Sequence, residues 1–159
     1  MNEFLEILEK NSKYTNEQLA VMLNKSVEEV RAIIQKFEEE NVILGYNTLI
    51  NWEKTDKEKV TALIEVKVTP QRGEGFDKVA ARIYRYPEVK ACYLMSGGFD
   101  LTVIIEGSTM KEVALFVAEK LAPLESVLST ATHFVLKKYK DKGTIFEEKQ
   151  KDDREVLFI

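Results

Sequence analysis

Strand and helix signals alternate between residues 60 and 142 in an order that few folds accommodate. Six segments with the hydrophobic period of a strand or a helix follow one another. Pro70, Pro87 and Pro123 mark the ends of three of them. In chain order we expect a strand at 60–69, a helix at 73–86, strands at 88–96 and 100–106, a helix at 108–121 and a strand at 126–139. This β-α-β-β-α-β order predicts a ferredoxin-like domain, whose antiparallel sheet carries both helices on one face.

The strand expected at 100–106 is apolar on both of its faces. Four of its side chains are large and apolar, with almost no polar interruption: Leu101, Val103, Ile104 and Ile105. A strand with this pattern is covered on both sides, whereas one layer of helices covers only one side. An exposed apolar face of that extent would favour aggregation. We therefore expect a second copy of the chain to cover the other face, in a sheet-to-sheet homodimer.

The first 52 residues carry two helix-start signals close together. Thr15 with Gln18 and Ser26 with Glu29 each have the spacing of a capping box. Asn24 stands in the turn between the two helices and tolerates a left-handed backbone better than most residues. This pattern favours a helix-turn-helix, whose second helix can enter the major groove of DNA. It also fits a three-helix core used for packing or dimerisation, and the residues alone leave both interpretations open.

A further helix is expected before Asn11, which makes three helices in this part of the chain. Apolar residues recur at helical spacing in all three of them. We expect the inward faces to consist of Phe4, Leu5, Ile7 and Leu8, then Leu19, Ala20, Met22 and Leu23, and then Val27, Val30, Ile33, Ile34 and Phe37. Residues 42–50 are β-rich and are expected to form a strand that leads out of the helical part. The expected fold class is thus α+β, with an N-terminal helix-turn-helix domain at 1–52, a ferredoxin-like βαββαβ domain at 53–142 and a C-terminal extension at 143–159.

Composition excludes several classes of protein. Cys92 is the single cysteine and His133 the single histidine, so neither an internal disulfide nor a closed zinc site fits within one chain. No apolar run approaches the roughly 20 residues of a membrane helix, and the acidic, amphipathic N-terminus is unlike a signal peptide. We expect a cytoplasmic protein with no metal, no other cofactor and no membrane partner.

Three segments of the sequence are similar to those of one known family. They are EEENVILGY at 38–46, PEVKACYLMSGGFD at 87–100 and THFVLKK at 132–138. In this order, together with the two capping boxes, they resemble the Lrp/AsnC (feast/famine) transcriptional regulators over residues 1–140. The resemblance implies a DNA-binding domain joined to an effector-binding domain that dimerises and often assembles into octamers. It also implies genes of amino-acid metabolism as targets and a free amino acid as the effector.

The resemblance places the effector between protomers, near the G-x-x-D loop. The effector-binding candidates are Ser96, Gly97, Gly98, Phe99, Asp100, Thr130 and Thr132. The two glycines allow the backbone to approach a ligand and to offer N–H groups to a carboxylate, and Asp100 could accept bonds from an ammonium group. From the residues alone, the same segment fits a tight hairpin turn in which Asp100 only satisfies backbone donors.

The outward face of the third helix, which follows Ser26, carries few basic side chains for a helix that contacts DNA. The DNA-binding candidates are Lys25, Ser26, Glu28, Arg31, Ala32, Gln35 and Lys36. Related proteins commonly carry several arginines on this helix. Residues 1–50 hold five basic and nine acidic side chains, a net charge of −4, although phosphate neutralisation supplies much of the affinity of such modules. Each module should therefore bind weakly, and oligomerisation would multiply the contacts.

Two classes of function remain open. One is a sequence-specific DNA-binding regulator that senses a small molecule, and the other is an effector-binding oligomeric partner protein with little specific DNA affinity. A third, more distant alternative is an enzyme, because haem-pathway decarboxylases share this architecture and a histidine is proposed to act in them. His133 lies inside a strand with no second histidine, so we expect it to be structural and the protein not to be an enzyme.

Overall fold

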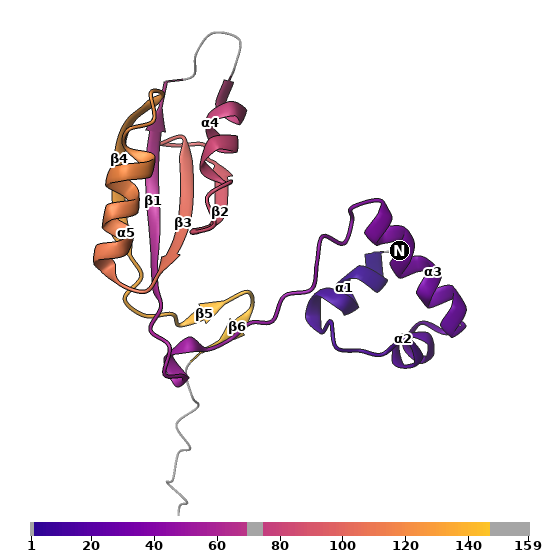
Figure 1. Ribbon diagram of the computed structural model, residues 1–159. Coiled ribbons are helices and arrows are strands. Elements are labelled where there is room, and N and C mark those ends of the chain that lie inside the picture. Colours follow the sequence, from indigo (N-terminus) through magenta and orange to yellow (C-terminus); the bar gives the residue numbers. More distant parts are fainter. Residues whose placement is uncertain (1, 70–74, 147–159) are drawn as a thin grey trace, which may run out of the picture. The chain divides into compact units, whose positions relative to one another are not determined.

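The computed structural model describes residues 2–69 and 75–146. The chain forms two compact units, Met1–Leu49 and Ile50–Ile159, and each is described here by itself (Figure 1). The expected boundary between residues 52 and 53 therefore falls just inside the second unit. The expected C-terminal extension is described only as far as residue 146, and the remainder of it lies outside the described residues.

The first unit consists of three short helices, and the second and third begin where the capping boxes predict. Their bounds are Asn2–Lys10 for α1, Asn16–Leu23 for α2 and Val27–Glu39 for α3. Both capping boxes are present: the Thr15 hydroxyl accepts the N–H of Gln18 at 3.3 Å, and the Ser26 hydroxyl accepts the N–H of Glu29 at 3.1 Å. Asn24 ends α2 with φ 52°, the left-handed conformation expected for the turn.

The three helices bury one small apolar core. Its buried members are Phe4, Leu8, Leu19, Ala20, Val30 and Phe37, and the rings of Phe4 and Phe37 lie 6.0 Å apart. Met22 is wrongly placed in this core by the sequence analysis, because its side chain is 51% exposed. Met22 is exposed because of its position around the axis of α2. Leu19, Ala20 and Leu23 define the buried face of α2, and Met22 lies roughly 100° around the helix from the centre of that face.

The strand expected at 42–50 is absent from this chain. No residue between Val42 and Ile50 belongs to a strand, and Leu44 is 87% exposed. A strand needs a neighbour to pair its N–H and C=O groups, and no segment among the described residues pairs with this one. The β-rich composition of the segment is therefore not matched by a partner within one chain.

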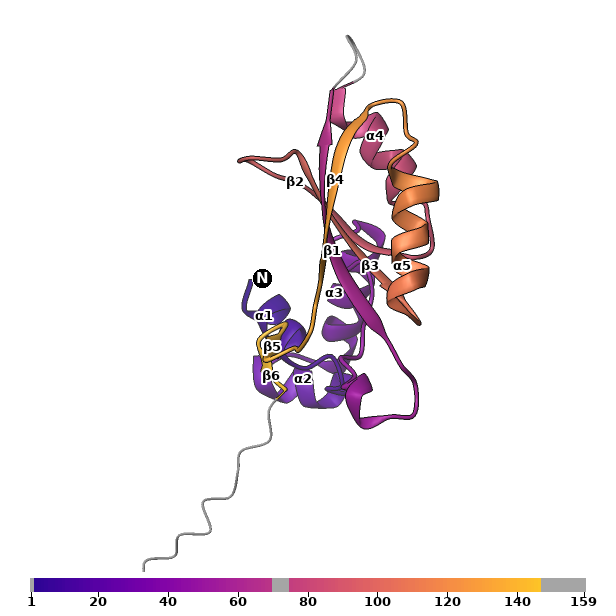
Figure 2. The same ribbon diagram turned by 90° about the vertical axis from the view of Figure 1, so that its left-hand side faces the viewer.

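The second unit contains the βαββαβ domain. Its elements are β1 (Val60–Val68), α4 (Gly75–Ile83), β2 (Val89–Leu94), β3 (Leu101–Gly107), α5 (Met110–Phe116), which continues as the π-helical turn η2 (Val117–Leu121), and β4 (Val127–Phe134). The strands form one antiparallel sheet in the order β2-β3-β1-β4. Figure 2 shows both long helices on the same side of this sheet, as the sequence predicts.

The core of the second unit lies between the sheet and these helices. It is formed mainly by Ala62, Ile64, Val66, Val68, Val79, Ile83, Leu101, Val103, Ile105, Val113, Phe116 and Leu121. Cys92 packs against it, half-buried, and burial raises the pKa of its thiol. In this position Cys92 packs as a small hydrophobic residue.

The ends of several elements differ from the predictions. The described part of α4 begins at Gly75 and stops at Ile83, and residues 70–74 lie outside the described residues. The last long strand ends at Phe134 rather than at residue 139. A two-stranded hairpin that the sequence analysis did not anticipate, β5 (Lys140–Asp141) with β6 (Thr144–Ile145), follows it. The expected domain boundary at residue 142 falls inside this hairpin.

Candidate DNA-binding and effector sites

Helix α3 presents its candidate DNA-binding residues to solvent. All seven are exposed: Lys25, Ser26, Glu28, Arg31, Ala32, Gln35 and Lys36. The Ser26 hydroxyl is used by the helix cap. Gln35 and Lys36 each contact an acidic residue one helical turn later. Gln35 Nε2 donates to Glu39 Oε1 at 2.8 Å, and Lys36 Nζ lies 3.8 Å from Glu40 Oε1. These contacts are solvent-exposed, so a phosphate can replace the carboxylate at little cost.

Arg31 is the one arginine of this helix. Its charge contributes slightly to the lowered pKa of Glu17 at the start of α2, for which hydrogen bonding to the backbone of Glu17 is the main cause. The structure also exposes two apolar residues of α2, Val21 and Met22. Both lie on the helix that precedes α3; Val21 was outside the inward face expected from the sequence, whereas Met22 was expected to be buried.

The predicted effector loop is a compact connection tied to the first strand. Asp100 holds it through three hydrogen bonds: its N–H donates to the Val66 carbonyl at 3.1 Å, its carbonyl accepts the N–H of Met95 at 2.8 Å, and its carboxylate Oδ2 accepts the N–H of Val68 at 2.8 Å. One carboxylate oxygen thus satisfies a backbone donor, as the hairpin interpretation expects. The loop is consequently fixed at its base.

The tip of this loop is open. Ser96, Gly97 and Gly98 are exposed, and Phe99 and Asp100 are half-buried. A Cβ atom built on Gly97 or Gly98 would meet no atom within 4 Å, so there is free space beside the backbone. Gly97 has φ +145°, a conformation that side-chain-bearing residues rarely adopt. The structure therefore brings five of the seven effector candidates together.

The two threonines lie apart from the loop within one chain. Thr130 is paired with Val66 and Thr132 with Ile64, so both project toward the face that the helices cover. The sheet order places β1 between their strand, β4, and the loop strand β3. The loop and the threonines consequently flank β1 rather than face each other.

The second face of the sheet is mixed in character, and β3 is not apolar on both faces as expected from the sequence. Leu101, Val103 and Ile105 all belong to the core on the helix side, and the residues of β3 on the second face are Thr102, Ile104 and Glu106. Leu63 on β1 is paired with Ile104 on β3 and His133 on β4, and both Leu63 and Ile104 are half-buried. His133 Nε2 lies 3.4 Å from Glu65 Oε1, which gives the histidine a polar partner on this face. No three His, Cys, Asp or Glu side chains gather as a metal site would require within the described ranges.

Family comparisons match both units. Residues 5–43 match the winged helix-turn-helix DNA-binding family, and residues 61–145 match the Lrp/AsnC ligand binding domain. None of the helices in the described part of the chain combines the length and the apolar character needed to cross a bilayer.

Relatives and solved structures agree with these matches. The chain is 54% identical to the HTH-type transcriptional regulator YugG of Bacillus subtilis, over 98% of this chain and 94% of that protein. It is 26% identical to the leucine-responsive regulatory protein of Haemophilus influenzae, over 87% and 82% of the two chains.

A structure of a Neisseria meningitidis transcriptional regulator in complex with L-Met has the same fold, with a TM-score of 0.70 and 23% identity over 87% and 88% of the two chains. Escherichia coli AsnC shares it as well, with a TM-score of 0.65 and 18% identity over 85% and 89% of the chains. These observations confirm the resemblance and the fold class. The chain belongs to the Lrp/AsnC family and is a DNA-binding transcriptional regulator in which a winged helix-turn-helix domain is joined to a ligand-binding domain that senses a small molecule.

Proposed function

We propose that this regulator is a cytoplasmic homodimer that binds double-stranded DNA through α3 and senses a free amino acid at the loop formed by residues 96–100. The observation that carries the proposal is the loop itself: its base is fixed by Asp100, while its glycine tip is open. A fixed base with an accessible backbone is what a small-ligand site requires.

An amino acid suits the chemistry of this loop. Backbone N–H groups at the glycine tip can hold a carboxylate. One oxygen of the Asp100 carboxylate already accepts the N–H of Val68, so the side chain is oriented before a ligand arrives, and its charge can attract an ammonium group. The leucine-responsive protein and the regulator crystallised with L-Met support this ligand class by their family relationship to the chain.

The second sheet face supports the homodimer. Leu63 and Ile104 lie side by side in its centre, and only one face of the sheet is covered by helices. A second copy of the sheet would cover both residues and remove them from water. A ligand at a loop near that interface could bias how two protomers fit together, since an effector acts through its different affinities for two states. Further assembly of dimers into octamers, as in the family, would multiply weak DNA contacts.

Calorimetry with a panel of free amino acids tests the effector site. The informative variant is Asp100→Asn, because an amide oxygen can still accept the Val68 N–H while the negative charge is lost. We expect the wild type to bind at least one amino acid and Asp100→Asn to lose that binding with unchanged circular dichroism. Asp100→Ala also leaves the Val68 N–H unpaired, which should cost about 1–3 kcal/mol of stability.

Gly97→Val is a second variant to be measured in the same calorimetric titrations. A β-branched residue is strained at the positive φ of Gly97, so we expect both effector binding and stability to fall. If an amino acid binds wild type and Asp100→Asn equally, the effector site lies elsewhere in the domain. If no amino acid binds the wild type at millimolar concentration, the amino-acid class is wrong.

A further inference from the structure

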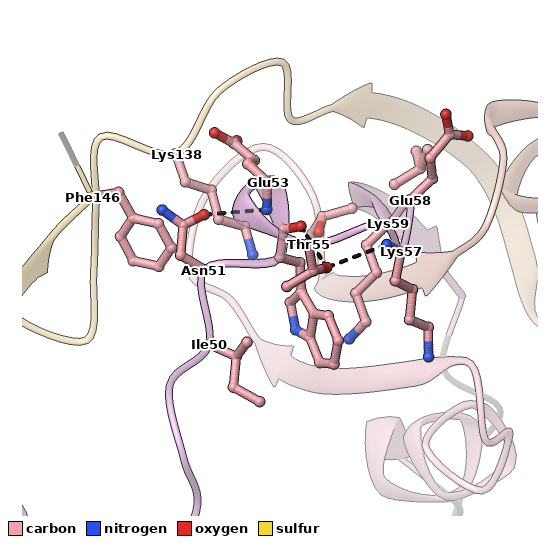
Figure 3. A pocket seen from close by; sticks show the side chains of 12 residues that line it. Ile50, Asn51, Glu53, Thr55, Lys57, Glu58, Lys59, Lys138 and Phe146 are labelled. Atoms are coloured by element: carbon pink, nitrogen blue, oxygen red, sulfur yellow. Dashed lines mark hydrogen bonds between the residues drawn. The ribbon is translucent and has the colours of Figure 1, made fainter. Parts of the chain in front are cut away.

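A cavity of about 370 Å³ opens where the chain enters the second unit. It lies between residues 50–61 and the segment that follows β4, far along the sequence. The side chains that form its walls include Ile50, Asn51, Trp52, Lys57, Lys59, Lys138 and Phe146 (Figure 3). Its volume is within the range of small-molecule sites, which are roughly 300–1,000 Å³.

The indole of Trp52 is the largest apolar surface in this cavity, and two ammonium groups accompany it. Lys59 Nζ lies 4.5 Å and Lys57 Nζ 5.3 Å from the centroid of the ring. Lys59 is held in this position because its Nζ also lies 2.8 Å from Glu106 Oε2 on β3. Two ammonium groups are therefore held beside an aromatic wall, and the charge of one of them, Lys59, is balanced by Glu106.

The other end of the cavity adds further hydrogen-bond donors. The side-chain oxygen of Asn51, Oδ1, accepts the N–H of Glu53 at 3.2 Å, and the side-chain NH₂ group of Asn51 supplies two further donors. Figure 3 shows Asn51 and Lys138 lying between Phe146 and the lysines, while the carboxylate of Glu58 points away from the ammonium groups of Lys57 and Lys59. The lining thus combines aromatic and apolar side chains with ammonium and amide donors, and the side chains of Glu53 and Glu58 also belong to it.

We propose that this cavity binds a small organic anion with a flat apolar body, of the aryl-carboxylate class and without an amino group. The flat body would pack against Trp52 and Phe146, and the carboxylate would meet the ammonium groups of Lys57 and Lys138. Lys138 Nζ lies 3.9 Å from Asp141 Oδ2, so at Lys138 the ligand carboxylate would compete with a partly exposed ion pair. The ammonium group of an amino acid would be repelled by the same lysines. This site is separate in residues and in ligand class from the amino-acid site proposed at residues 96–100.

The location of the cavity gives such a ligand a route to regulation. Residues 50–59 directly follow the DNA-binding unit in the chain, and Lys138 and Phe146 belong to the C-terminal part of the ligand-binding unit. A ligand that contacts both segments would restrict the connection between them. The cavity is therefore a second sensing site, built from the connecting segment itself.

Trp52 is the only tryptophan of the chain, so its fluorescence reports on this cavity directly. We would titrate the full-length protein with phenylacetate, with its neutral analogue phenylacetamide, with its cationic analogue phenethylamine and with inorganic phosphate. The expected result is a saturable change in Trp52 emission with phenylacetate and little or none with the other three compounds. Equal responses to phenethylamine or to phosphate alone would overturn the proposed ligand class, and no saturable response to any compound would overturn the site.

Variants separate this cavity from the effector loop. Lys57→Met and Lys138→Met should each weaken phenylacetate binding on the order of tenfold, the effect of one lost charge-assisted contact. Lys142→Met is the matched control, because Lys142 is an exposed lysine at the hairpin turn outside the cavity wall, and it should bind normally. Asp100→Asn should also bind phenylacetate normally, whatever happens to its amino-acid binding. A loss of the fluorescence response in Asp100→Asn would place the ligand at the loop and contradict the second site.

Discussion

Ser26 closes the first turn of α3 by accepting the N–H of Glu29, while the Glu29 carboxylate accepts the N–H of Ser26 at 2.8 Å. This reciprocal pair satisfies two donors that the helix leaves open. Ser26→Ala should therefore lower the free energy of unfolding of the first unit by about 1 kcal/mol, measured by urea denaturation followed by circular dichroism.

Ser26→Asp should restore most of that loss, since aspartate also caps helices well. Ser12→Ala is the matched control because Ser12 is exposed and lies outside both capping boxes. A Ser12→Ala loss as large as that of Ser26→Ala would show that the effect is not one of capping.

Residue-level features that depend on neighbouring residues were predictable from the sequence. The capping boxes and the left-handed Asn24 need only a few residues of local context, and both are present in the structure. The exposure of Met22 was not foreseen, and neither was the identity of the backbone donor to the Asp100 carboxylate, the N–H of Val68. Each depends on tertiary geometry, namely the rotation of α2 and the approach of β1 to a loop 32 residues away.

At the scale of elements, α3 is the helix that we predict to contact DNA. Arg31 and Lys36 are its exposed cations, and a unit with net negative charge depends strongly on them. Arg31→Ala should weaken binding to the DNA upstream of the protein's own gene by about 1–3 kcal/mol if Arg31 contacts a base. The measurement is electrophoretic mobility shift at fixed salt, with and without pooled amino acids.

A matched cation in the same unit serves as the control for this prediction. Lys10→Ala removes a positive charge from α1, at the exposed end of a helix that is not the predicted recognition helix, and should change affinity less. If Arg31→Ala and Lys36→Ala both bind as tightly as the wild type, α3 is not the recognition helix.

The order of the helices and strands was predictable from the sequence, whereas the pairing of the strands was predictable only in part. The βαββαβ order follows from hydrophobic periods, and the structure has it. The segment 42–50 has the composition of a strand but pairs with no strand in the part of the chain that the structure describes, so its composition alone was misleading. The β5–β6 hairpin was missed because each of its strands has only two residues, too few to show a period.

At the scale of the whole molecule, the sheet has two faces and its own helices cover one. Ile104 lies on the second face beside Leu63, with Glu65 and His133 nearby in the ladder. The apolar pair gains stability only when it is removed from water. This half-buried apolar pair is the part of the second face that the proposed homodimer would cover.

Ile104→Glu tests that interface in the full-length protein. A carboxylate buried between two sheets without a cationic partner should cost several kcal/mol, which corresponds to more than a hundredfold weaker association. We therefore expect wild type to sediment as a dimer or larger at micromolar concentration and Ile104→Glu to shift toward the monomer with its circular dichroism retained. Leu115→Glu is the matched control, because Leu115 is an exposed residue on α5, the helix that covers the other face of the sheet, and it should associate like the wild type. If Ile104→Glu remains associated as strongly as Leu115→Glu, the second sheet face is not where the copies meet.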